Sequence, residues 1–82
     1  MSQASLMHNK DYWKRETKDD MSAMILCFPK ASQWGIDNGR ISKLEIRNKD
    51  KKVVCNYDRG WDVKPTDKKV KDFYDEIIKK YN

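Results

Sequence analysis

The C-terminal part of the chain carries the pattern that most constrains its fold. Apolar side chains recur there at i, i+3, i+4, i+7, i+8 and i+11, which is the one-sided stripe of an amphipathic α-helix. The stripe consists of Val70, Phe73, Tyr74, Ile77, Ile78 and Tyr81. Pro65 precedes it, and Thr66 or Asp67 is suited to cap the helix. Lys79 and Lys80 suit the negative end of the helix dipole.

This helix needs a partner, because a helix of such length is marginal alone in water. The segments before it predict β-strands at residues 12–17, 21–28, 41–47 and 52–57. We therefore expect an α+β fold: a small antiparallel sheet of three to five strands with one C-terminal helix packed on one face, in the order β-β-β-β-α. Eighty-two residues allow only one domain. Residues 1–10 are expected to form a flexible N-terminal segment and residues 11–82 the domain.

The segment between the second and third predicted strands is irregular and contains two glycines. Asn38-Gly39 is suited to a two-residue type I′ hairpin turn, so we expect a short strand at residues 33–37 to pair with the strand that follows. Long loops on small scaffolds often carry function. Trp34 with its basic neighbours has the stacking surface and charge of a single-stranded nucleic-acid site. Trp34 is equally suited to cover an open end of the sheet.

The positive charge of the chain is concentrated in one segment. The formal net charge is +5, from 18 Lys and Arg against 13 Asp and Glu. Residues 40–52 hold six basic and two acidic side chains, a local charge of +4. The basic ones are Arg40, Lys43, Arg47, Lys49, Lys51 and Lys52. Such a field attracts phosphate or an acidic protein surface, and a solubilising lysine-rich surface explains the excess equally well.

The cysteines and the single histidine argue against a metal or redox site. Cys27 and Cys55 lie in apolar runs, so each is expected to be a buried, reduced thiol. Zinc needs about four ligands at short spacings, and His8 is the only histidine. We expect no cofactor and no metal. The sequence predicts no membrane span or secretion signal, and therefore a cytoplasmic protein.

Residues 57–62, Tyr-Asp-Arg-Gly-Trp-Asp, form the most distinctive local cluster. Arg59 and Trp61 are suited to be an exposed recognition pair, one for an anion and one for stacking. Asp58 and Asp62 are too few for a metal-dependent nuclease, which remains a remote alternative. A structural interpretation is a bent strand in which Gly60 permits the bend and Trp61 is an anchor. We expect no enzymatic activity, because acid–base chemistry at neutral pH needs burial that so small a core hardly provides.

Two segments together resemble a known group of proteins. Residues 32–44 contain a "GI-x-x-GRISKL" motif, and residues 57–62 follow it as "YDRGWD". The pair, followed by a C-terminal helix, resembles small uncharacterised proteins of low-GC Gram-positive bacteria and their phages. The resemblance covers about residues 32–80. It implies an intracellular protein encoded by a phage or another mobile element, and it assigns no activity or functional residue.

Two functions compete on this evidence. The first is a protein-interaction module, an inhibitor or adaptor of a host or defence factor, with a host or phage protein as partner. Three Trp and four Tyr are more than a thin core must bury, so some should be exposed as interface anchors. A homodimer through a sheet edge is a variant of this hypothesis.

The alternative is a nucleic-acid-binding module that uses the basic 40–52 hairpin with exposed tryptophans. Lysines and arginines would contact phosphates while tryptophans stack on bases. Acidic side chains within the hairpin count against it. The candidate binding residues for the two hypotheses together are Trp34, Arg40, Lys43, Arg47, Arg59 and Trp61.

Overall fold

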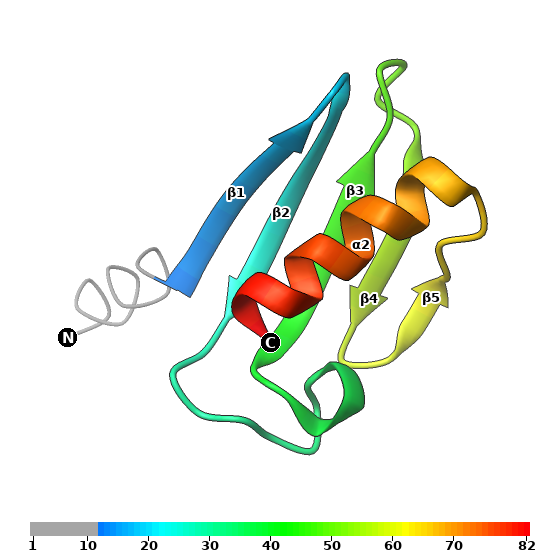
Figure 1. Ribbon diagram of the computed structural model, residues 1–82. Helices are drawn as coiled ribbons and strands as arrows, with labels where there is room; N and C mark the ends of the chain where they lie inside the picture. Colours follow the sequence, from blue (N-terminus) through cyan, green and yellow to red (C-terminus); the bar gives the residue numbers. More distant parts are fainter. Residues whose placement is uncertain (1–11) are drawn as a thin grey trace, which may run out of the picture.

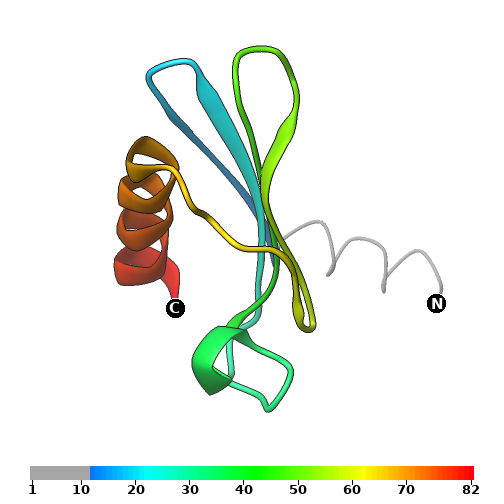
Figure 2. The same cartoon turned by 90° about the vertical axis from the view of Figure 1, so that its right-hand side faces the viewer.

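The computed structural model describes residues 12–82, which form one antiparallel sheet crossed by one helix (Figure 1). The strands are β1 (Trp13–Lys18), β2 (Met21–Cys27), β3 (Ile41–Arg47), β4 (Val53–Asp58) and β5 (Trp61–Val63), and the helix is α2 (Lys68–Tyr81). The strands lie in chain order, β1-β2-β3-β4-β5. Seen from the side, α2 covers one face of the sheet (Figure 2). The predicted fold class is confirmed, and the predicted segment 1–10 lies outside the described residues.

The helix forms as its apolar stripe predicts. Asp67 is the N-cap, and its side chain accepts a hydrogen bond from the Lys69 backbone amide at 3.2 Å. The buried stripe residues are Val70, Phe73 and Ile77. The core between helix and sheet includes Ala23, Ile25, Cys27, Ile36, Ile41, Leu44, Ile46, Cys55 and Tyr57. No helix among residues 12–82 is long and apolar enough to cross a bilayer.

Both cysteines are free and buried, as predicted. Burial raises the pKa of the Cys55 thiol to about 12. The thiolate is the reactive form of cysteine, so this side chain acts as a small apolar core residue.

The predicted strand at residues 33–37 and the type I′ turn at Asn38-Gly39 are wrong. A 3₁₀ turn, η1 (Ile36–Asn38), occupies the segment, and Gly39 has φ −98°, whereas a type I′ turn needs positive φ at both central residues. The physical reason is Ile36, which is only 1% exposed and belongs to the core. Burying this side chain at the end of the sheet folds the loop back on itself.

The end of β4 differs from the sequence expectation in two ways. β5 is a fifth strand that the pattern did not reveal, and it places Trp61 opposite Tyr57. The bend between β4 and β5 uses Arg59, whose φ is +56°, while the φ of Gly60 is not positive. The interpretation that Gly60 permits the bend is therefore wrong, because the left-handed residue is Arg59.

The end of α2 and the loop before β3 hold each other in place. The side chain of Asn82 accepts from the Ile41 amide at 2.9 Å and donates to the Ile36 carbonyl at 3.0 Å. The loop itself closes where Gly35 lies against Gly39, so tightly that a Cβ on Gly35 would come within 2.0 Å of the Gly39 carbonyl oxygen. The loop that carries Trp34 is thus set by close backbone packing.

Gly35→Ala should destabilise the fold because backbone, rather than a mobile side chain, occupies the space of the new methyl group. We expect a loss of about 2–3 kcal/mol in the free energy of unfolding, measured by urea denaturation. Gly60→Ala is the matched control, since its Cβ would meet nothing within 4 Å, and it should change the value by less than about 0.5 kcal/mol. Equal effects of the two substitutions would contradict this account of the loop.

Side-chain contacts tie β1, an edge strand of the sheet, to the helix. Glu16 accepts hydrogen bonds from Lys80 Nζ at 2.7 Å and from the Tyr81 hydroxyl. Lys18 pairs with Glu76 further along α2. The hydrogen bonds from Lys80, and then from Tyr81, lower the pKa of Glu16 from its ordinary value of 4.5.

Acid should therefore weaken the attachment of β1. A carboxyl group with a lowered pKa in the folded state contributes stability above its unfolded pKa and loses it as the pH falls through the folded value. We expect unfolding free energy to fall below about pH 4.5, less steeply in Tyr81→Phe and least in Glu16→Gln. Urea unfolding between pH 7 and 3 measures the three slopes. If Glu16→Gln retains the wild-type slope, Glu16 is not the group responsible.

Candidate binding surface

One face of the sheet is covered by α2, and no other part of residues 12–82 covers the opposite face (Figure 2). We call this the open face. Cross-strand neighbours point to the same side of a sheet, so the pairing registers arrange its side chains in rows. One row is Trp13–Leu26–Lys43–Asp58, and the next is Arg15–Met24–Glu45–Asn56. The open face therefore presents the apolar side chains Trp13, Met24 and Leu26 on β1 and β2, beside Arg15, and charged and polar side chains on β3 and β4.

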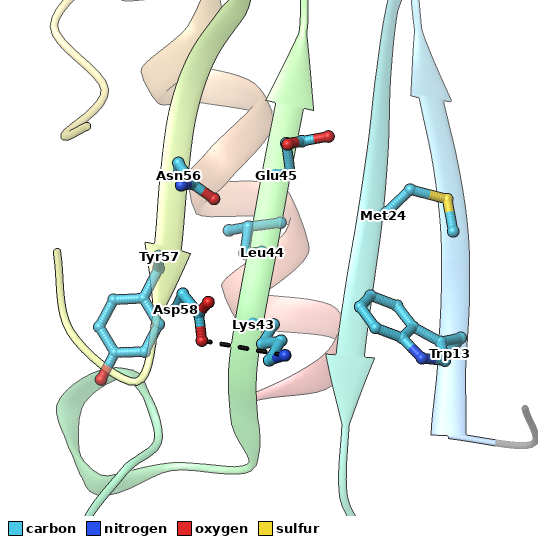
Figure 3. A pocket seen from close by; sticks show the side chains of 8 residues that line it. All are labelled: Trp13, Met24, Lys43, Leu44, Glu45, Asn56, Tyr57 and Asp58. Carbon is cyan, nitrogen blue, oxygen red and sulfur yellow. Dashed lines mark ion pairs between the residues drawn. The ribbon is translucent and has the colours of Figure 1, made fainter. Parts of the chain in front are cut away.

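A groove of about 620 Å³ lies on the open face (Figure 3). Trp13 and Met24 line it from β1 and β2, while Asn56 and Asp58 line it from β4. Trp13 is 38% and Met24 40% exposed. The volume is within the range of small ligand sites and can hold one or two side chains of a partner.

The charged side chains of the open face differ in how well they are paired. Near one end of the sheet, Arg47 Nε lies 2.9 Å from Glu45 Oε1, a closed ion pair with a hydrogen bond. In the groove, Lys43 Nζ lies 4.0 Å from Asp58 Oδ1. Arg59 Nε lies 3.6 Å from the same oxygen. Both separations exceed hydrogen-bonding distance, so two cations share one carboxylate loosely.

Four of the six residues predicted as binding residues gather around Tyr57 and Asp58. The Tyr57 hydroxyl donates to the Trp34 carbonyl at 2.9 Å, and the Trp61 ring lies edge-on to the Tyr57 ring at 5.2 Å. Lys43 and Arg59 approach Asp58. The described structure thus brings together the two segments that the sequence singled out separately.

The two tryptophans of this cluster differ in role. Trp34 is 55% exposed. Trp61 is 37% exposed, and its ring also packs against Tyr74 of α2 at 5.6 Å. Trp61 is therefore partly an anchor between sheet and helix, whereas the Trp34 side chain is available to a partner. The expectation that some tryptophans are exposed is confirmed, because all three are more than a third exposed.

The other two predicted residues lie apart from the cluster. Arg40 donates to the Tyr81 carbonyl from Nε at 3.1 Å and from Nη2 at 2.7 Å, so its guanidinium closes the end of α2. Arg47 lies on the open face beyond Glu45 and also donates to the Lys51 carbonyl at 3.2 Å. Asp58 and Asp62, considered above as metal ligands, have other partners. Asp62 accepts a hydrogen bond from the side-chain amide of Asn56 at 3.1 Å, and Asp58 lies near Lys43 and Arg59. No group of three metal-ligating side chains occurs within residues 12–82.

Sequence reasoning missed Trp13 and Met24 as surface residues. The turn at Asp19-Asp20 could have indicated them. This short turn pairs Lys18 with Met21, and the resulting register places Trp13 and Met24 on the same face of the sheet. β2 by itself does not indicate which side the helix covers, because it is apolar on both. The charged side of β3 indicates it only through the register of the two strands.

A comparison with protein-family models matches residues 12–82 to a family described as a domain of unknown function (DUF7678). The chain belongs to this family. The family match spans every residue of the sheet, the groove and the helix, and its description assigns no activity. No curated protein and no solved structure matches the chain.

Arg59 occupies a left-handed conformation that arginine disfavours and asparagine tolerates. Its exposed pair with Asp58 contributes little to stability. Arg59→Asn should therefore raise the free energy of unfolding by about 0.5–1 kcal/mol in urea denaturation. Lys49→Asn, in a turn where φ is not positive, is the control and should give no gain. A loss of stability in Arg59→Asn would mean that the guanidinium supports the turn.

Proposed function

We propose that this chain is a small non-enzymatic binding protein whose partner, another protein, docks on the open face. The observation that carries the proposal is an uncovered sheet face that presents Trp13 and Met24 beside charges of both signs. Aromatic and methionine side chains within a polar surround are typical of the centres of protein interfaces.

The features of the sheet edges favour docking on the face rather than on an edge. Four of the six residues of β1 are charged, and β5 has only three residues. Charged and short edge strands are devices that prevent edge-to-edge pairing. A homodimer through a sheet edge is therefore the less favoured arrangement.

The pairing of charges favours a protein over a nucleic acid. Of the basic residues suggested for phosphate contact, Arg40 is bonded to the end of α2 and Arg47 to Glu45. Asp58 and Asp62 add negative charge beside the groove. The sugar-phosphate backbone of a nucleic acid needs a continuous row of available cations, and these carboxylates interrupt such a row.

The exposure of the groove supports a binding role without catalysis. The side chains of Lys43 and Asp58 are 43% and 54% exposed. Water has free access to groups so exposed, whereas catalytic sites exclude water from the reacting atoms. The motif resemblance extends the proposal to a phage-type inhibitor or adaptor that acts on a host or defence factor in the cytoplasm.

Photo-crosslinking from the open face tests this function. Met24 is replaced by the photoreactive amino acid p-benzoylphenylalanine, and the chain is irradiated inside the cells that encode it. We expect a discrete protein adduct that resists nuclease and disappears when Trp13→Ala is added. The matched control carries the same amino acid at Lys71, an exposed position on α2, and should give no such adduct.

Each other outcome contradicts the proposal in a recognisable way. Adducts of equal yield from Met24 and Lys71 would mean non-specific contact. Loss of the adduct on nuclease treatment would support nucleic acid instead. An adduct of twice the chain mass would indicate self-association through the open face. Thermal unfolding of Trp13→Ala, compared with wild type, shows whether the loss of crosslinking is a loss of fold.

A further inference from the structure

The charges at the Asp58 end of the groove are not balanced. Lys43 and Arg59 approach the same Asp58 oxygen at 4.0 and 3.6 Å, and neither contact is a hydrogen bond. Asp62, the next carboxylate along the chain, is already bonded to Asn56. Two cations, Lys43 and Arg59, therefore share the single carboxylate of Asp58. An additional carboxylate placed between Lys43 and Arg59 would give these side chains the close partner they lack.

The opposite wall of the groove is apolar and lies at a defined spacing from these cations. Trp13 and Lys43 belong to one cross-strand row, with Leu26 between them. Neighbouring strands are about 4.8 Å apart, so the backbones of Trp13 and Lys43 are about 10 Å apart. A peptide in the polyproline II conformation rises about 3.1 Å per residue with three residues per turn, so side chains three residues apart lie on the same side and about 9 Å apart. A single short segment can therefore contact both walls.

The charge of the whole chain favours the same kind of partner. A net charge of +5 attracts an acidic protein at long range and repels a basic one. The apolar wall adds a requirement that charge alone does not impose, namely a large side chain to cover Trp13 and Met24.

We infer that the groove receives an acidic–apolar segment of a partner protein, with a carboxylate between Lys43 and Arg59 and a large apolar side chain against Trp13 and Met24. This inference rests on the proposed function and specifies the chemistry of the partner. The carboxylate and the apolar side chain are three residues apart in a segment of polyproline II conformation, which turns both toward the groove.

Titration of the ¹⁵N-labelled chain with matched hexapeptides, followed by NMR, tests the inference. The probe is acetyl-SETVFS-amide, which places a glutamate three residues before a phenylalanine. We expect saturable shifts of the backbone amides of Lys43 and Arg59 and of the Trp13 indole. Affinity should fall at least fivefold with acetyl-SQTVFS-amide or acetyl-SETVAS-amide, and no binding is expected with acetyl-SKTVFS-amide. Raising the salt from 50 to 500 mM should weaken binding of the glutamate peptide alone.

Variants of the chain assign the effect to the two cations. In Lys43→Gln and Arg59→Gln, the preference for the glutamate peptide over the glutamine peptide should shrink to less than twofold. Arg47→Gln is the matched control, because Arg47 is already paired with Glu45 on the same face, and it should keep the full preference.

The remaining outcomes overturn the inference and separate its failure from that of the proposed function. Equal binding of the glutamate, glutamine and lysine peptides would leave an apolar docking face without acidic selectivity. Stronger binding of the oligonucleotide dT₁₀ at the same amides would replace a protein partner by nucleic acid. Absence of peptide binding with Trp13-dependent crosslinking at Met24 would overturn only the acidic–apolar partner. If Met24 gives no crosslink either, the proposed function fails as well.

Discussion

The packing of one helical stripe on one face of the sheet is the interaction on which this structure depends. Val70, Phe73 and Ile77 are the buried side chains of α2, and they form the core with the strands and with Ile36 of η1. A two-layer fold has one core, so a sheet with a single helix has one covered and one uncovered face. Trp13 and Met24 are exposed on the open face because no second element of residues 12–82 covers it.

The end of the sheet is organised by contacts that join distant segments. Tyr57 is the central residue, because its hydroxyl donates a hydrogen bond to the Trp34 carbonyl and its ring contacts Trp61. Ile36 and Asn82 hold the other side of the same loop. The Trp34 loop and the Trp61 ring are thus held by buried and hydrogen-bonded neighbours. Held in this way, the loop loses less conformational entropy if a partner contacts Trp34.

The elements that were predicted correctly are those whose signal is local and long. The stripe of α2 and the alternation of β3 are periodic over seven residues or more, and β2 is a continuous apolar run of the length of a buried strand. The loop before β3 was mispredicted because the local preference of Asn38-Gly39 for a hairpin turn yields to the burial of Ile36. The strand β5, with three residues, is too short to have a period and exists through its pairing with β4.

The sequence by itself determined the helix stripe, four of the strands, the buried cysteines and the excess of aromatic residues over what the core could bury, since each follows from local spacing or composition. Only the tertiary structure decided that Trp13 and Met24 share a face with Lys43 and Glu45, because β2 is apolar on both faces and its register with β3 sets which of them joins the charged face of β3. It also decided which charges are paired. Arg47 meets Glu45 within its own strand, and Arg40 meets the helix end, while Lys43 and Arg59 converge on Asp58. Long-range contacts depend on strand register and helix position, which arise only when the whole chain packs.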